Sequence, residues 1–189
     1  MKYLAALGVM LLLAGCATLS EEDCLTGDWA GIGQRDGASG QVAAAQFARH
    51  VKACEKAGVI PDRAAWQRGY AQGLQGYCTP IRGLDEALAG RAYRNVCPTD
   101  AEAGFLRGYR IGEADEQARQ EVRKIESEIA QLRSRNAQLS AALAATPDPG
   151  LSQELRSNEV EILRLQLDLG FARLDASRTR RAVAEFRAG

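Results

Sequence analysis

Residues 136–158 read NAQLSAALAATPDPGLSQELRSN, and this stretch decides the fold. Pro147, Pro149 and Gly150 break a helix, and the residues around them mirror each other at equal distances from Pro147. The mirrored pairs are Leu143 with Leu151, Leu139 with Leu155, and Asn136 with Asn158. Paired Asn side chains can bond to each other and set the register of a coiled coil. The stretch therefore predicts an antiparallel helical hairpin with its tip near Pro147.

The sequence on both sides of this stretch continues the same pattern. Apolar residues alternate spacings of three and four, which is the heptad pattern of a coiled coil. The first arm has Val122, Ile125, Ile129, Leu132, Asn136, Leu139 and Leu143, and the second has Leu151, Leu155, Asn158, Ile162, Leu165, Leu169, Ala172 and Ala176. These two seams predict a coiled-coil hairpin over residues 113–189.

Before the hairpin, aromatic residues precede pairs of glycines that lie four residues apart. The three instances are Trp29 with Gly33 and Gly37, Trp66 with Gly69 and Gly73, and Phe105 with Gly108 and Gly112. Residues four apart share a helix face. Each interior Gly costs about 1 kcal/mol relative to Ala, so three pairs need a packing reason. They predict helix faces that another backbone approaches closely.

We expect this Gly-rich region to be helical. The predicted helices cover about residues 26–36, 42–57 and 61–77, and a fourth begins after Pro98. Residues 79–96 contain Pro80, Gly83 and Gly90, which predicts a loop with at most one short helical turn. The predicted fold class is therefore all-α. A small disulfide-clipped domain of Gly-rich helices covers residues 24–112, and a projecting antiparallel coiled-coil hairpin follows it.

Four of the five cysteines form an even set: Cys24, Cys54, Cys78 and Cys97. In an exported chain such a set predicts two disulfides, for which three connectivities are possible. We favour Cys24–Cys54, because two antiparallel helices with a short connection bring these positions together. The remaining bridge, Cys78–Cys97, would then close the predicted loop between two helices.

The N-terminus has the features of an export signal. Lys2 precedes the apolar segment Leu4–Leu13, which is shorter than the roughly 20 residues of a membrane-spanning helix and fits a secretory signal. The residues Leu13-Ala14-Gly15-Cys16 resemble the lipobox of bacterial lipoproteins. This resemblance implies that residues 1–15 are a signal peptide and that Cys16 carries lipid at the start of a tether, residues 16–23. An ordinary signal peptide with a coincidental cysteine is the alternative.

Several short motifs also resemble a known family. Tyr77-Cys78-Thr79-Pro80, Val96-Cys97-Pro98 and Thr26-Gly27-Asp28-Trp29 resemble proteobacterial lipoproteins catalogued as domain of unknown function 2799. The resemblance covers about residues 24–112. It implies a cell-envelope address and the cysteine pattern, and it supplies no catalytic residues. By resemblance to enterobacterial sorting, Ala17 after the lipidated cysteine implies the outer membrane, facing the periplasm.

The composition narrows the classes of function. Twenty-four basic and twenty-four acidic residues give zero formal net charge, so we expect no nucleic-acid partner. The single histidine, His50, leaves little material for a Ser-His-Asp triad or a multi-His metal site. His50 and Cys54 have a zinc-compatible spacing, but two further ligands would be needed. Gly31–Gly37 approximates a dinucleotide fingerprint without the preceding strand. We therefore predict no enzyme activity, no cofactor and no metal.

The second arm of the hairpin carries an additional apolar stripe, nearly opposite its heptad seam. Its members are Val160, Leu163, Leu167, Phe171 and Leu174. A helix in a two-helix hairpin needs one apolar face, so a second face predicts a further partner. We favour a second copy of the chain. Another envelope protein, or the N-terminal domain folding back along the hairpin, are the alternatives.

These features favour a membrane-anchored lipoprotein that acts as a non-enzymatic structural or interaction adaptor in the cell envelope. The membrane contact would be made through lipidated Cys16. A glycan- or peptidoglycan-binding module with an aromatic stacking platform is the alternative, and its candidate rings are Trp29, Trp66, Tyr70, Tyr77, Tyr93 and Tyr109. Exposure of Trp29, Trp66 and Tyr70 would distinguish the two. An envelope enzyme is least favoured, because no nucleophile–base pair is visible in the sequence.

Overall fold

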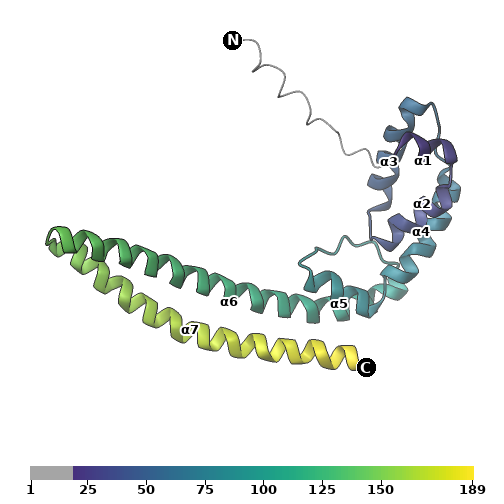
Figure 1. The fold of residues 1–189 in the computed structure, drawn as a ribbon. Helices are drawn as coiled ribbons and strands as arrows, with labels where there is room; N and C mark the ends of the chain where they lie inside the picture. The colour runs from purple at the N-terminus through teal and green to yellow at the C-terminus, as the bar shows by residue number, and fades with distance from the viewer. Residues whose placement is uncertain (1–18) are drawn as a thin grey trace, which may run out of the picture. The chain divides into compact units, whose positions relative to one another are not determined.

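The computed structural model describes residues 19–189. The predicted signal peptide, residues 1–15, and the predicted lipidation site, Cys16, lie outside the described residues. The described chain is helical without strands, which confirms the all-α prediction (Figure 1). Its elements are α1 (Glu21–Thr26), α2 (Trp29–Ala38), α3 (Ala43–Cys54), η1 (Glu55–Ala57), α4 (Arg63–Tyr77), α5 (Pro80–Leu88), α6 (Thr99–Ala145) and α7 (Pro149–Ala188).

The described chain forms two compact units. The first contains α1 to α4 together with Arg94–Thr99, and the second contains Thr79–Tyr93 and Asp100–Gly189. This division differs from the expected one after residue 112, which falls inside α6. The helix continues there because the sequence after Gly112 contains no helix-breaking residue before Pro147. The helix that begins at Thr99 is therefore also the first arm of the hairpin.

The first unit is built on close contact between α2 and α4. A Cβ atom added at Gly33 would overlap the carbonyl of Trp66, and one added at Gly69 would overlap the carbonyl of Ala30. Both would lie closer than the 3.0 Å that real Cβ atoms essentially never pass. Only glycine therefore lets the two backbones meet. This confirms the packing role predicted for these glycine pairs.

The second unit repeats this arrangement between α5 and α6. Gly83 faces the carbonyl of Phe105, and Gly108 faces the carbonyl of Pro80, again too closely for a Cβ atom. The prediction of a loop over residues 79–96 is therefore wrong for Pro80–Leu88. The physical reason is that Pro80 stands at the start of a helix, where its fixed φ is favourable, and that Thr79 caps this start by accepting from the Arg82 N–H at 3.2 Å.

The two glycine-packed helix pairs also share their finer details. The Tyr70 hydroxyl donates to the Gln41 carbonyl at 2.6 Å, and the Tyr109 hydroxyl donates to the Arg91 carbonyl at 3.0 Å. Further equivalent positions are Gly40 and Gly90, both left-handed, and the rings of Trp66 and Phe105. The same supersecondary motif thus occurs once in each unit.

Helices α6 and α7 run side by side as an antiparallel hairpin (Figure 1). Asn158 Nδ2 donates to Asn136 Oδ1 at 2.9 Å, so the polar pair meets in the predicted register. Ile125, Ile129 and Leu165 form a buried cluster between the helices. Asp148 begins α7 by accepting from the Leu151 N–H at 3.0 Å.

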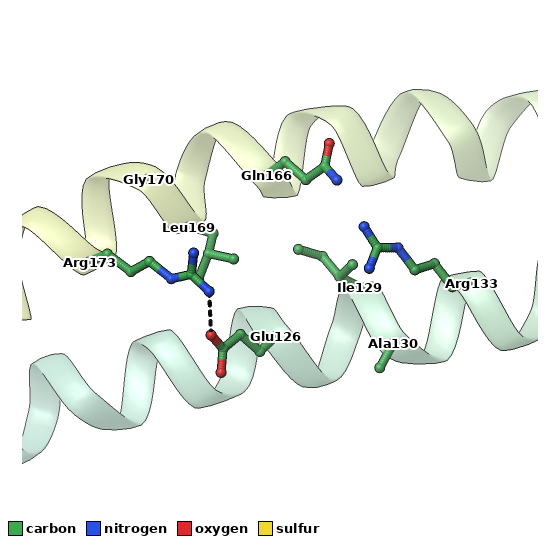
Figure 2. Close-up of a pocket in the computed structure, with 8 residues that line it drawn as sticks. All are labelled: Glu126, Ile129, Ala130, Arg133, Gln166, Leu169, Gly170 and Arg173. Atoms are coloured by element: carbon green, nitrogen blue, oxygen red, sulfur yellow. Dashed lines mark hydrogen bonds and ion pairs between the residues drawn. The ribbon is translucent and has the colours of Figure 1, made fainter.

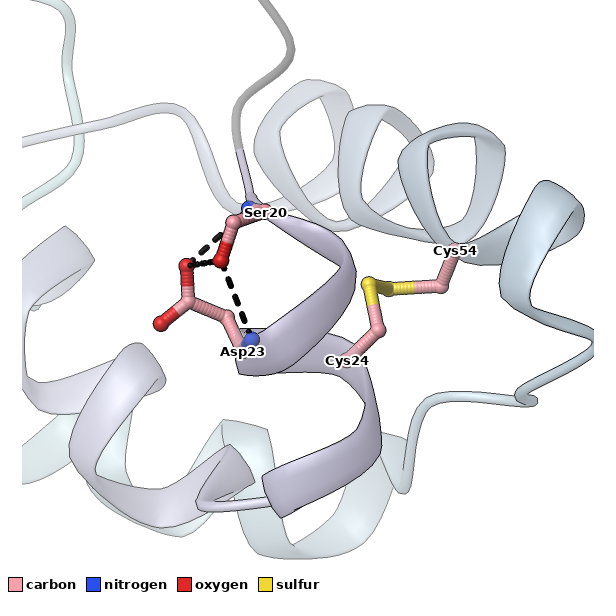
Figure 3. Close-up of a disulfide and its surroundings, with 4 residues drawn as sticks. All are labelled: Ser20, Asp23, Cys24 and Cys54. Carbon is pink, nitrogen blue, oxygen red and sulfur yellow. Dashed lines mark hydrogen bonds between the residues drawn. A yellow bond between two sulfur atoms is a disulfide. The ribbon is translucent and has the colours of Figure 1, made fainter.

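Both predicted disulfides are present. Cys24–Cys54 and Cys78–Cys97 have Cα separations of 5.6 Å and 5.5 Å, which suit a disulfide. The first bridge holds α1 against the end of α3 (Figure 3). The expected tether, residues 16–23, ends earlier than predicted because α1 begins at Glu21. Ser20 and Asp23 form a capping box there, in which the Asp23 N–H donates to Ser20 Oγ at 3.1 Å.

Candidate interaction surface

The five predicted stripe residues form an exposed apolar face on α7. Val160, Leu163, Leu167, Phe171 and Leu174 are 58–72% exposed. Leu165 and Ala176, on the seam face of the same helix, are each 6% exposed. The seam with α6 therefore uses one face of α7 and leaves the stripe uncovered by any described residue. We call this set of five residues the stripe.

Charged side chains border the stripe on both edges. On one edge Arg164 lies 3.6 Å from Glu161 and 3.6 Å from Asp168, all on α7. On the other edge Arg173 Nη2 lies 2.8 Å from Glu126 Oε1 of α6. These groups are substantially exposed, so each pair stabilises the monomer by at most about 1 kcal/mol. Their main effect is to give the apolar face a polar rim.

A shallow groove of about 460 Å³ runs along the surface where α6 and α7 meet, beside the stripe (Figure 2). Ile129 and Leu169 contribute its apolar surface. Arg133 and Gln166 extend toward each other across one part of it, and the ion pair between Arg173 and Glu126 crosses another. Gly170 also lines the groove. The groove is thus an open, mixed polar and apolar surface.

Gly170 differs from the glycines that join the helix pairs. A Cβ atom added at Gly170 would meet nothing within 4 Å, whereas one added at Gly73 or Gly112 would press on a neighbouring helix. Among the described residues, Gly76 in the last turn of α4 is the only other interior helical glycine at which an added Cβ atom would meet nothing within 4 Å. No described contact therefore explains a glycine in the middle of α7, where it costs about 1 kcal/mol relative to Ala.

A buried polar cluster joins α2, α3 and α4 in the first unit. Asp36 Oδ2 lies 2.7 Å from His50 Nε2 and accepts from Trp66 Nε1 at 2.8 Å, while Oδ1 accepts from Gln46 Nε2 at 3.0 Å. The Asp36 carboxyl group therefore joins side chains from three helices. His50 is 1% exposed and Cys54 is in a disulfide, so the zinc-compatible spacing of these two residues serves packing. Among the described residues, no group of three or more His, Cys, Asp or Glu could hold a metal ion.

The aromatic residues of the alternative glycan-binding prediction lie in the core. Trp29, Trp66 and Tyr70 are all buried, and the Trp66 and Tyr70 rings stack with their centroids 5.0 Å apart. Burial raises the pKa of Tyr70 above its ordinary 10.0, with a smaller contribution from the Asp36 carboxylate. Trp29, Trp66 and Tyr70 therefore present no open face to a sugar. The polar cluster was not predicted, because its members are separated in the sequence and carry no motif.

None of the helices among residues 19–189 is long and apolar enough to cross a membrane. Comparison with family models finds a match to a family described as "Protein of unknown function (DUF2799)", over residues 28–114. Neither the curated proteins nor the solved structures contain a match to this chain. The matched region takes in both glycine-packed helix pairs and ends within α6, before most of the hairpin. Residues 28–114 of this chain are therefore similar to the family described as a protein of unknown function, DUF2799.

Proposed function

We propose that this protein is a membrane-anchored envelope lipoprotein that acts as a non-enzymatic structural or interaction adaptor. The observation that carries the proposal is the stripe. Five large apolar side chains stay exposed on α7 although the seam between α6 and α7 is already filled. A contiguous exposed apolar face with a polar rim is typical of an interaction site.

The proposed address is the outer membrane, facing the periplasm. Its support is the lipobox-like Leu13-Ala14-Gly15-Cys16, together with Ala17 after the cysteine. The two disulfides add to this support, because disulfides persist mainly in oxidising compartments such as the periplasm. Several acyl chains on Cys16 would hold the protein stably at a membrane, whereas a single chain would be marginal.

The geometry supports binding rather than catalysis. The Asp36–His50 pair, which could orient a base in an enzyme, is buried and bonded to Trp66 and Gln46. The groove beside the stripe is open and lined by exposed ion pairs. The glycan-binding alternative has less support, because Trp29, Trp66 and Tyr70, whose exposure it required, are buried.

Replacing Cys16 tests the anchor. We expect the wild type to fractionate with the outer membrane, and we expect the precursor to accumulate when lipoprotein signal cleavage is inhibited with globomycin. The Cys16→Ala variant should be released from the membrane fraction. If this variant still fractionates with membranes, residue 16 is not the anchor.

A photo-crosslinking amino acid at Leu167 tests the adaptor function in intact cells. We expect adducts with a protein chain from Leu167, which lies at the centre of the stripe. The matched control is Ser134, an exposed position on the face of α6 turned away from its seam. Equal labelling from both positions, or none from Leu167, would argue against an interaction through the stripe.

A further inference from the structure

We propose that the stripe is the contact between two copies of this chain, with α7 packed antiparallel on α7 of the second copy about a two-fold axis at Leu167. This inference rests on the proposed function and names the partner of the stripe. The first observation is that the stripe is symmetric. Val160 and Leu174 are equidistant from Leu167, as are Leu163 and Phe171. Antiparallel packing therefore places an apolar side chain opposite an apolar side chain in every layer.

Attractive charge contacts outnumber repulsive ones in this packing. An antiparallel two-fold axis brings the same edge of both helices together, and at about 100° per residue Arg164 and Asp168 share one edge of the stripe. Arg164 of each copy then faces Asp168 of the other. On the opposite edge, Glu159 of each copy faces Arg173 of the other. Both ion pairs occur twice. By the same geometry Glu161 of each copy faces Asp175 of the other, so two like-charge contacts partly offset the four ion pairs.

Parallel packing would use the same apolar layers but would match the charges less well. It would bring opposite edges together, so that Glu159 of one copy faces Glu161 of the other, twice. Arg164 would face Gln166 instead of an acidic residue of the other copy. Arg173 would face Asp175, so attractive and repulsive contacts would be equal in number. Charge complementarity sets orientation in paired helices. The antiparallel arrangement is therefore favoured over the parallel one.

Gly170 provides an independent argument for this packing. It lies beside Phe171 on the edge of the stripe, and nothing in its own chain occupies the space where its Cβ would be. In the antiparallel register, Leu163 of the second copy is at nearly the same height along the interface. The missing side chain leaves room for that Leu and for the close approach of the second helix. A residue that the monomer does not explain thus has a role in the dimer.

The available area suits a modest dimer. Five side chains at 58–72% exposure offer on the order of 600 Å² of surface per copy, or about 1,200 Å² in total. This is the lower bound of stable specific interfaces. Arg156 and Arg178 of the two copies face each other beyond the last apolar layers and confine the contact to the stripe. We therefore expect association at micromolar concentration.

Sedimentation of the purified chain from residue 17 onwards, with both disulfides intact and no lipid, tests the dimer. We expect a dimer at micromolar concentration. Leu167→Glu places two carboxylates against each other on the axis and should raise the dissociation constant by about 100-fold or more. Ser134→Glu is the control and should leave the dimer intact. Thermal melting checks that both variants are folded. A wild type that stays monomeric at tens of micromolar overturns the inference.

Cysteine crosslinking tests the orientation. A mixture of the Val160→Cys and Leu174→Cys variants should give a crosslink between the two chains, and each variant alone should give none. Equivalent Val160 positions are about 21 Å apart in the antiparallel register. Crosslinking of each variant with itself would show parallel packing and overturn the proposed register. A monomeric wild type that still gives adducts from Leu167 in cells, with a different protein, would reject the dimer and leave the adaptor proposal standing.

Discussion

Asp36 connects three elements of the first unit through a single carboxylate. His50, Trp66 and Gln46 all contact its oxygens, and all four residues are buried. Asp36→Ala would leave three donors without their acceptor in the core, which should lower the free energy of unfolding by about 3 kcal/mol or more. Urea denaturation measures this change. Asp36→Asn is the control and should lose less, because its amide oxygen still accepts one bond. Equal, small effects of both variants would contradict the structural role of the cluster.

Tyr70 should make the stability of the first unit depend on alkaline pH. Burial raises the pKa of its hydroxyl above 10.0, so the folded state favours the protonated form. This contribution is fully present below pH 10 and is lost as the pH rises through the higher pKa of the folded state. The stability difference between wild type and Tyr70→Phe, measured by urea unfolding from pH 8 to pH 11.5, should therefore shrink above pH 10. A difference that stays constant over this range would contradict the assignment.

The effect of a helical glycine on stability depends on what lies beside it. The same Gly→Ala substitution at two positions tests this. Gly69→Ala adds a Cβ that overlaps the backbone of α2, and the resulting displacement should destabilise the first unit by about 2 kcal/mol. Gly170→Ala adds a Cβ in open space and should stabilise α7 by about 1 kcal/mol. The second change is best measured in the Leu167→Glu background, where association does not contribute. Urea unfolding of both variants is the measurement, and equal effects would contradict the packing described for Gly69.

The Asn136–Asn158 pair should fix the register of the hairpin and lower its stability. Replacing both residues with Leu fills the seam with apolar side chains and should raise the unfolding free energy of the hairpin by about 1–2 kcal/mol. Asn158→Leu alone leaves the Asn136 amide without its partner and should instead destabilise the hairpin. Circular dichroism during urea unfolding distinguishes these outcomes. A single variant as stable as the double one would show that the bond does not matter.

At the scale of the whole molecule, the two compact units should respond differently to reduction. Both disulfides join cysteines of the first unit, at sequence separations of 30 and 19 residues, although the segment closed by Cys78–Cys97 includes Thr79–Tyr93 of the second unit. Each should stabilise that unit by about 3 kcal/mol in the chain-entropy model. Reductant should therefore lower the melting temperature of the first unit most, and should affect the transition of the α6–α7 hairpin, which contains no cysteine, least. Calorimetry with and without reductant is the measurement, and a single transition that shifts as a whole would contradict independent units.

Features encoded by spacing along the chain were predictable from the sequence. The mirror positions around Pro147 determined the hairpin register, and the glycine pairs identified the helix faces that make close contact. The disulfide partners followed from the order of the helices. In each case the determining interaction repeats along one helix or joins elements that are neighbours in the sequence, so local periodicity contains the information.

Features that depend on burial were decided only by the tertiary structure. The stretch with Pro80 and Gly83 resembled a loop, but its glycine packs on α6 and its proline begins α5. The contact between Asp36 and His50 has no sequence signal, and neither does the open space beside Gly170. The type of a residue shows what it could contact, whereas burial depends on which distant segments pack around it. That packing is a collective property of the folded chain, so it could not be derived from a residue and its sequence neighbours.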